Sequence, residues 1–100
     1  MIRSKKITQS ARGEECTLNI AGVCSYDPET VVFCHFPDGA QGMGIKASDL
    51  SGAYGCYACH QVVDGHARCD EFIDNRDWYL RRAQNRTLER MFDKGILKVA

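Results

Sequence analysis

The sequence contains no long hydrophobic run, and several classes of protein are excluded by what it lacks. No apolar segment approaches the ~20 residues that a membrane span requires. The charged start, residues 1–6, is followed by no apolar stretch, so we expect no signal peptide and a cytoplasmic location. Repeats, low-complexity segments and Pro/Ser-rich linkers are also missing. These absences predict one small domain over residues 1–100 that does not contact a membrane.

The chain has no net charge, because 13 basic residues balance 13 acidic ones. A uniformly basic nucleic-acid coat is therefore excluded, but the charges are unevenly distributed. Residues 1–12 carry +4, residues 13–77 carry three basic against eleven acidic residues, and residues 78–100 carry +4. Two basic ends around an acidic middle are compatible with a polyanion at the ends and a cation in the middle, or with two solvated surfaces.

Six cysteines in 100 residues are many for a protein expected in a reducing compartment, where such residues more often bind metal than form disulfides. Cys56 and Cys59 form a C-x2-C pair, and Cys16 and Cys24 form a looser pair across Gly22. Four thiolates could surround one structural zinc tetrahedrally. A redox C-x2-C or simple buried cysteines remain alternatives. We interpret the other two cysteines, Cys34 and Cys69, as packing residues or free thiols.

The pattern of residue types predicts an α+β fold. Leu18 and Ile20 are expected in a short strand before the turn at Gly22. Further elements are expected as strands over 30–36 and 51–55, helices over 57–64 and 77–94, and a terminal strand or docked tail over 96–99. Between the strands, the glycine-rich segment 38–48 is expected to be a loop.

The long helix over 77–94 is expected to be amphipathic, with Asp77 capping its start and Gly95 ending it. Its expected apolar face consists of Trp78, Leu80, Ala83, Leu88, Met91 and Phe92. Its basic stripe of Arg82, Arg86 and Arg90 could contact nucleic-acid phosphates.

Three residues could perform chemistry. His60 and Asp64 are one helical turn apart, so they could hold a divalent cation while leaving positions open. His35 ends the first expected strand and could take a proton from water. We expect His35 to face His60 and Asp64 across a shallow notch. His66, beyond Gly65, is a weaker third ligand, and each histidine could also be merely structural.

This order of motifs resembles the YbcO-like family of prophage-encoded HNH (ββα-metal, His-Me finger) nucleases, from about residue 10 to the end. The matching positions are Ala11-Arg12-Gly13, Cys16, Ile20, Gly22-Val23-Cys24, Pro28-Glu29-Thr30, His35, Gly44-x-Lys46-x-x-Asp49-Leu50, Cys56-x-x-Cys59-His60-x-x-x-Asp64 and Gly95. The resemblance implies a small zinc-stabilised treble-clef or ββα-metal domain, with its core over 13–66, a basic N-terminal arm over 1–12 and an added C-terminal helix.

The resemblance also implies roles for individual residues. The four paired cysteines would hold structural Zn²⁺, His35 would be the general base, and His60 with Asp64 would hold Mg²⁺ or another catalytic divalent cation. The sequence departs from the wider HNH pattern at Cys34, where an acidic ligand usually stands. The middle Asn of that pattern has Asp49 as its nearest counterpart, with a loop-fixing role.

The implied activity is metal-assisted hydrolysis of DNA with little sequence preference. Phosphates would be contacted by the arginine stripe, by Lys46 and by basic residues of the N-terminal arm, Arg3, Lys5 and Lys6. A recombination protein could be a partner. Two other interpretations remain: a non-catalytic zinc module that binds nucleic acid or a protein, and a thiol oxidoreductase with a reactive Cys56.

Overall fold

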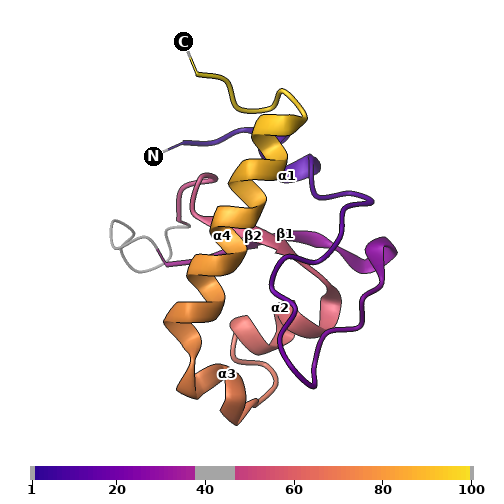
Figure 1. Ribbon diagram of the computed structural model, residues 1–100, viewed down its shortest axis with the longest axis vertical. Helices are drawn as coiled ribbons and strands as arrows, with labels where there is room; N and C mark the ends of the chain where they lie inside the picture. Colours follow the sequence, from indigo (N-terminus) through magenta and orange to yellow (C-terminus); the bar gives the residue numbers. More distant parts are fainter. Residues whose placement is uncertain (1, 38–46, 100) are drawn as a thin grey trace.

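The computed structural model describes residues 2–37 and 47–99. In chain order its elements are α1 (Lys5–Gln9), the 3-10 turn η1 (Pro28–Thr30), β1 (Val32–His35), β2 (Gly52–Gly55), α2 (Tyr57–Val63), α3 (Asp70–Asp74) and α4 (Arg76–Asp93). Within these residues, the two strands form one antiparallel sheet and the helices pack around it (Figure 1). The predicted α+β class is confirmed.

The hairpin pairs His35 with Gly52 and Val32 with Gly55. Glycine at position 52 is required by close approach, because a Cβ there would overlap the carbonyl oxygen of Cys34 and the ring of Phe33. That ring in turn meets the imidazole of His35 edge-on, with ring centroids 5.0 Å apart. Gly52 thus allows the end of β1, which carries His35, to pack tightly against β2.

Helix α4 packs on β2 and, in Figure 1, runs along much of the long axis of the molecule. Its fully buried Thr87 receives a hydrogen bond from the backbone N–H of Tyr54 at 3.1 Å and shares one with the hydroxyl of Thr17 at 2.9 Å. Thr17 in turn bonds the backbone of Tyr54 through both its N–H and its hydroxyl. The Thr87 hydroxyl therefore joins α4 to β2 and to the segment that directly follows Cys16.

The buried face of α4 differs from the expected one. Its buried residues are Tyr79, Ala83, Thr87 and Met91, spaced four apart. Trp78 and Phe92 are more than half exposed, so their assignment to the core face was wrong. The Trp78 ring instead lies beneath the guanidinium of Arg82, 4.3 Å from its carbon. The helix also begins at Arg76, so Asp77 lies in its first turn and is not the cap.

Other boundaries were predicted with mixed success. Both the second strand and α2 lie within one residue of expectation, and Gly65 ends α2 with a φ of 81°. The first strand is shorter than expected because η1 takes up its start. Leu18 and Ile20 are fully buried but form no strand, and residues 96–99 form none either. Ile96 and Leu97 pack on the core as a docked tail.

The N-terminal residues fold back on the molecule. Residues 5–9, expected in a basic arm, form α1, and its Ile7 is buried in the core. Most of the glycine-rich segment, including Lys46, lies outside the described residues. Across residues 2–37 and 47–99, no helix has the length and apolar character needed to cross a membrane.

Candidate active site and metal centre

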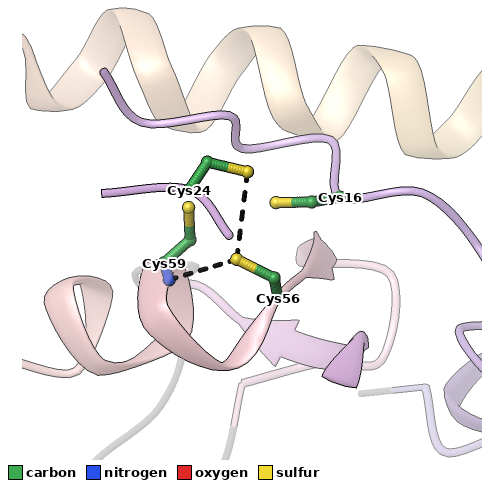
Figure 2. Close-up of side chains that lie close together, drawn as sticks. All are labelled: Cys16, Cys24, Cys56 and Cys59. Carbon is green, nitrogen blue, oxygen red and sulfur yellow. Dashed lines mark hydrogen bonds between the residues drawn. The ribbon is translucent and has the colours of Figure 1, made fainter. Parts of the chain in front are cut away.

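Four cysteine sulfurs converge between the segment 16–24 and the start of α2. The Sγ atoms of Cys16, Cys24, Cys56 and Cys59 all lie within 4.8 Å of one another. Figure 2 shows the first two reaching in from the irregular segment and the last two from the first turn of α2. The predicted pairing across the Gly22 turn is therefore observed. A group of four sulfurs at this separation could hold a metal ion such as zinc.

The surroundings of these sulfurs fit a bound cation. Backbone N–H groups of Asn19, Ser25 and Cys59 donate to sulfurs at 3.5 Å, as does the side-chain amide of Asn19 to Cys24. Such donors favour thiolates. A hydrogen bond with Cys59 lowers the pKa of Cys16 to about 5 and raises that of Cys59. The thiols thus compete for protons, and a divalent cation would allow all four to ionise.

The arginine stripe of α4 contacts the segment that carries Cys16. Arg82 donates to the carbonyl of Leu18 at 2.9 Å, and Arg86 donates to the side-chain oxygen of Asn19 at 3.1 Å. Since Asn19 also bonds two of the sulfurs, Arg86 acts on the cluster through it. The stripe therefore holds the first pair of cysteines in place, a role that the sequence did not indicate.

The third arginine of the stripe makes an ion pair. Arg90 and Lys94 lie 2.6 and 2.8 Å from the two carboxylate oxygens of Glu14. Burial by itself would raise the pKa of Glu14, but the hydrogen bonds from these two cations outweigh it and lower the pKa. The acidic segment before Cys16 is thereby joined to the end of α4.

A second group of metal-type donors lies on β1 and α2. Atoms of Cys34, His60 and Asp64 lie within 4.8 Å of one another, and His60 Nε2 is 2.9 Å from a carboxylate oxygen of Asp64. Burial raises the pKa of the Cys34 thiol to about 12, with further contributions from the negative charges of Asp64 and Cys16. His60 and Asp64 thus meet as predicted, but the third donor is Cys34.

His35 pairs with Asp49. Its Nε2 lies 2.8 Å from Asp49 Oδ1. Burial would raise the pKa of Asp49, but the hydrogen bonds from His35 and from the backbone N–H of Ser4 lower it. An ionised Asp49 accepts the Nε2 hydrogen, so in the neutral ring the lone pair is at Nδ1. This arrangement is suited to a general base.

The N-terminal segment helps to fix this pair. The backbone N–H of Ser4 donates to Asp49 Oδ2 at 2.7 Å, and the N–H of Asp49 donates to the carbonyl of Ile2 at 2.9 Å. Arg3 lies 3.6 Å from Asp49. Residues expected in a basic N-terminal arm therefore position the carboxylate that orients His35.

Strand alternation places the neighbours Cys34 and His35 in two different groups. Consecutive strand residues point to opposite faces, so Cys34 joins His60 and Asp64 while its neighbour His35 joins Asp49. Their Cα atoms are about 3.8 Å apart, so the two groups start from neighbouring backbone positions of β1. Sequence reasoning missed Cys34 as a donor, although its place directly before His35 was the available signal. His66 is exposed and outside both groups, and Cys69 precedes α3.

Both the sequence and the fold are similar to those of known proteins. Residues 5–96 match the family model described as "Putative nuclease YbcO". Proteins with that name from Escherichia coli (strain K12) and Enterobacteria phage 82 are each 41% identical over 69 residues, 68% of this chain and 69% of the relative. A solved structure described as "a putative bacteriophage protein from Escherichia coli str. K-12 substr. MG1655" covers 88% of this chain and 98% of its own, with TM-score 0.67 and 28% identity. The chain belongs to the YbcO family.

Proposed function

We propose that this protein is a metal-dependent endonuclease that hydrolyses DNA phosphodiester bonds with low sequence specificity, on an HNH-type (ββα-metal, treble-clef) scaffold. One observation carries the proposal: consecutive residues of β1 supply an oriented imidazole and a donor to a metal-type cluster. The family membership and the relatives' name, "Putative nuclease YbcO", support it. Hydrolysis of an unactivated phosphodiester requires a base and a cation, which these two groups would supply.

In this mechanism His35 takes a proton from the attacking water at Nδ1. Asp49 keeps Nε2 protonated and stabilises the imidazolium that forms, and Ser4 holds Asp49. His60 and Asp64 would hold the catalytic divalent cation. When bound there, the cation would stabilise the negative charge that develops on the phosphate and on the leaving 3′ oxygen.

The four-cysteine cluster has a structural role in this proposal. Four sulfur ligands close the coordination sphere of a zinc ion, so no position remains for substrate. Cys59 belongs to this cluster, and the next residue, His60, belongs to the other. Structural zinc would therefore fix the turn of α2 from which His60 and Asp64 project.

Backbone phosphates would be contacted by basic side chains. One candidate is Arg3, whose guanidinium lies 3.6 Å from Asp49, the partner of His35. The other proposed phosphate contacts are Arg82, Arg86, Arg90 and Lys46. The three arginines already bind segment 14–19, but a guanidinium has five N–H donors and can also bind phosphate oxygens. Such contacts give affinity that falls with salt and little base preference.

The test is a plasmid-nicking assay with added Mg²⁺, Mn²⁺ or Ni²⁺. His35→Ala should lower the nicking rate by about 10²–10⁴-fold, because a general base contributes about that much. Zinc content and folding should be unchanged. The matched control is His66→Ala, which removes an exposed histidine outside both clusters and should cleave like wild type.

Two outcomes would contradict the proposal. One is a His35→Ala variant that nicks as fast as wild type. The other is a folded, zinc-loaded wild type that fails to cleave supercoiled, linear or single-stranded DNA with any of these cations. The second outcome would favour a non-catalytic zinc module that binds nucleic acid or a protein.

A further inference from the structure

The donor group on β1 and α2 contains one sulfur, one nitrogen and one oxygen atom. Cys34 is fully buried, whereas the side chains of His60 and Asp64 are 31% and 40% exposed. The group therefore has a sulfur at its base and two donors at a rim open to solvent. We propose that Cys34 is a ligand of this site and makes it selective for a thiophilic divalent cation, of the class of Zn²⁺ or Co²⁺, over Mg²⁺. This inference concerns the cation of the function proposed above.

Two packed elements fix the three donors relative to one another. Cys34 pairs with Ala53 in the hairpin, so its side chain is held on the face of β1 towards α2. His60 and Asp64 are one turn apart on α2, and Cys59 ties the same turn to the four-cysteine cluster. The donors are thus positioned before any cation binds, which lowers the conformational cost of binding.

The donor types determine which cation fits. Mg²⁺ takes oxygen ligands in near-octahedral geometry and keeps several waters, so a thiol contributes nothing to its binding. Zn²⁺ and Co²⁺ accept mixed sulfur, nitrogen and oxygen ligands, and catalytic zinc commonly has three protein ligands and one open position. Three donors with an exposed rim match that arrangement.

The competing interpretation is that Cys34 is only a packing residue. Its burial and its raised pKa are consistent with an inert thiol. A packing thiol, however, has no need of an imidazole and a carboxylate within 4.8 Å of its sulfur. A coordinated cation also deprotonates a thiol outright, so the raised pKa does not oppose ligation. The two interpretations differ in whether a cation bound there contacts sulfur.

Cobalt absorbance separates them. Protein carrying one zinc per chain would be titrated with Co²⁺, and the near-ultraviolet thiolate-to-cobalt charge-transfer band recorded. Wild type should bind one further equivalent with this band, and a large excess of Mg²⁺ should not displace it. Cys34→Ser should lose the band while keeping its first zinc. The matched control Cys69→Ser, which alters a half-buried cysteine outside both groups, should keep it.

Three results would overturn the inference: Co²⁺ bound by wild type without the band, a band retained in Cys34→Ser, or displacement of Co²⁺ by Mg²⁺. The band requires no catalysis, so His35→Ala should retain it. A wild type that shows the band but cleaves no DNA would overturn the proposed nuclease and leave the Cys34 ligand standing. Cleavage with Mg²⁺ and no band would do the reverse.

Discussion

At the scale of single residues, Asn19 links the arginine stripe to the cysteine cluster. Its backbone N–H bonds Cys16, its side-chain amide bonds Cys24, and its side-chain oxygen accepts from Arg86. Its φ of 43° lies in the left-handed region, which asparagine tolerates better than most residues. Asn19 thus satisfies a backbone requirement and orients two sulfurs at once.

Replacing Asn19 by glycine separates these two roles. Asn19→Gly preserves the left-handed backbone but removes the amide, so we expect zinc affinity to fall by about 10–100-fold, as for other groups that orient metal ligands. Competition with a chromophoric chelator measures this. The control Asn85→Gly changes an exposed asparagine of α4 and should leave zinc affinity unchanged, although it costs about 1 kcal/mol of helix stability. Equal zinc affinity in Asn19→Gly and wild type would refute the role of the amide.

The candidate site was partly predictable from residue types. The four-cysteine cluster was predictable because each pair is brought together locally, the first by the turn at Gly22 and the second by the helix that Cys56 caps. His60 and Asp64 were predictable from helical spacing alone. The resemblance named Asp49 only as a loop-fixing residue. Its contacts with His35 and with the backbone of Ser4 were not predictable, since they depend on how distant segments fold together.

At the scale of secondary structure, the hydroxyl of Thr87 on α4 accepts a hydrogen bond from a backbone N–H of β2. This N–H belongs to Tyr54, and both Tyr54 and Thr87 are fully buried. Thr17 completes the network. Helix α4 is therefore attached to the sheet by a polar contact as well as by apolar packing.

Thr87→Val keeps the side-chain volume but removes this acceptor. We expect a loss of about 1–3 kcal/mol of unfolding free energy, because a buried N–H is left unpaired. Thr87→Ser is the matched control, since it retains the hydroxyl and loses one methyl group. Hydrogen exchange at Tyr54 N–H should accelerate in the valine variant and remain slow in the serine variant. Equal exchange in the two variants would show that the hydroxyl does not hold this N–H.

The elements were predictable where local signals agree. Glycine at 65 and at 95 ends α2 and α4 as predicted, with φ near 80° and 74° respectively. The face of α4 was predicted wrongly because apolarity alone assigned Trp78 to the core. A four-residue spacing from Tyr79 to Met91 decided the buried face, and it includes the polar Thr87. Leu18 and Ile20 alternate with polar residues as in a strand. Their segment forms no strand, and its backbone instead bonds the Cys16 sulfur and the side chains of Arg82 and Arg86.

At the scale of the whole molecule, the acidic middle of the chain and its basic end are joined by ion pairs in the folded protein. Glu14 from the acidic middle meets Arg90 and Lys94 from the basic end. The side chain of Glu14 is 10% exposed, and its cations are 51% and 33% exposed. Part of the predicted polyanion-binding charge is therefore neutralised within the protein.

This contact makes stability depend on pH. Because the folded-state pKa of Glu14 is lowered, its contribution is complete above the ordinary pKa of 4.5 and is lost as the pH falls below that value. We expect Glu14→Gln to cost about 1 kcal/mol at pH 7, a figure discounted for the solvent exposure of the cations. The difference in unfolding free energy between wild type and variant should shrink towards pH 3.

Comparing the two proteins at each pH cancels the effect of acid on the cysteine cluster, because both keep the same sulfurs. Glu14→Asp serves as a control that retains the charge with a shorter reach. A difference between wild type and Glu14→Gln that stays constant from pH 7 to pH 3 would show that the ion pair contributes nothing.

The wide spacing of the sulfurs along the chain has a consequence for biosynthesis. Cys16 and Cys24 leave the ribosome before Cys56 and Cys59, and the arginines of α4 that contact residues 14–19 follow all four. Because a nascent chain emerges N-terminus first, Cys16 and Cys24 are without the other two sulfurs of their group until α2 has been synthesised. Assembly of the four-sulfur group that we propose for zinc is therefore a late step in the synthesis of residues 14–90.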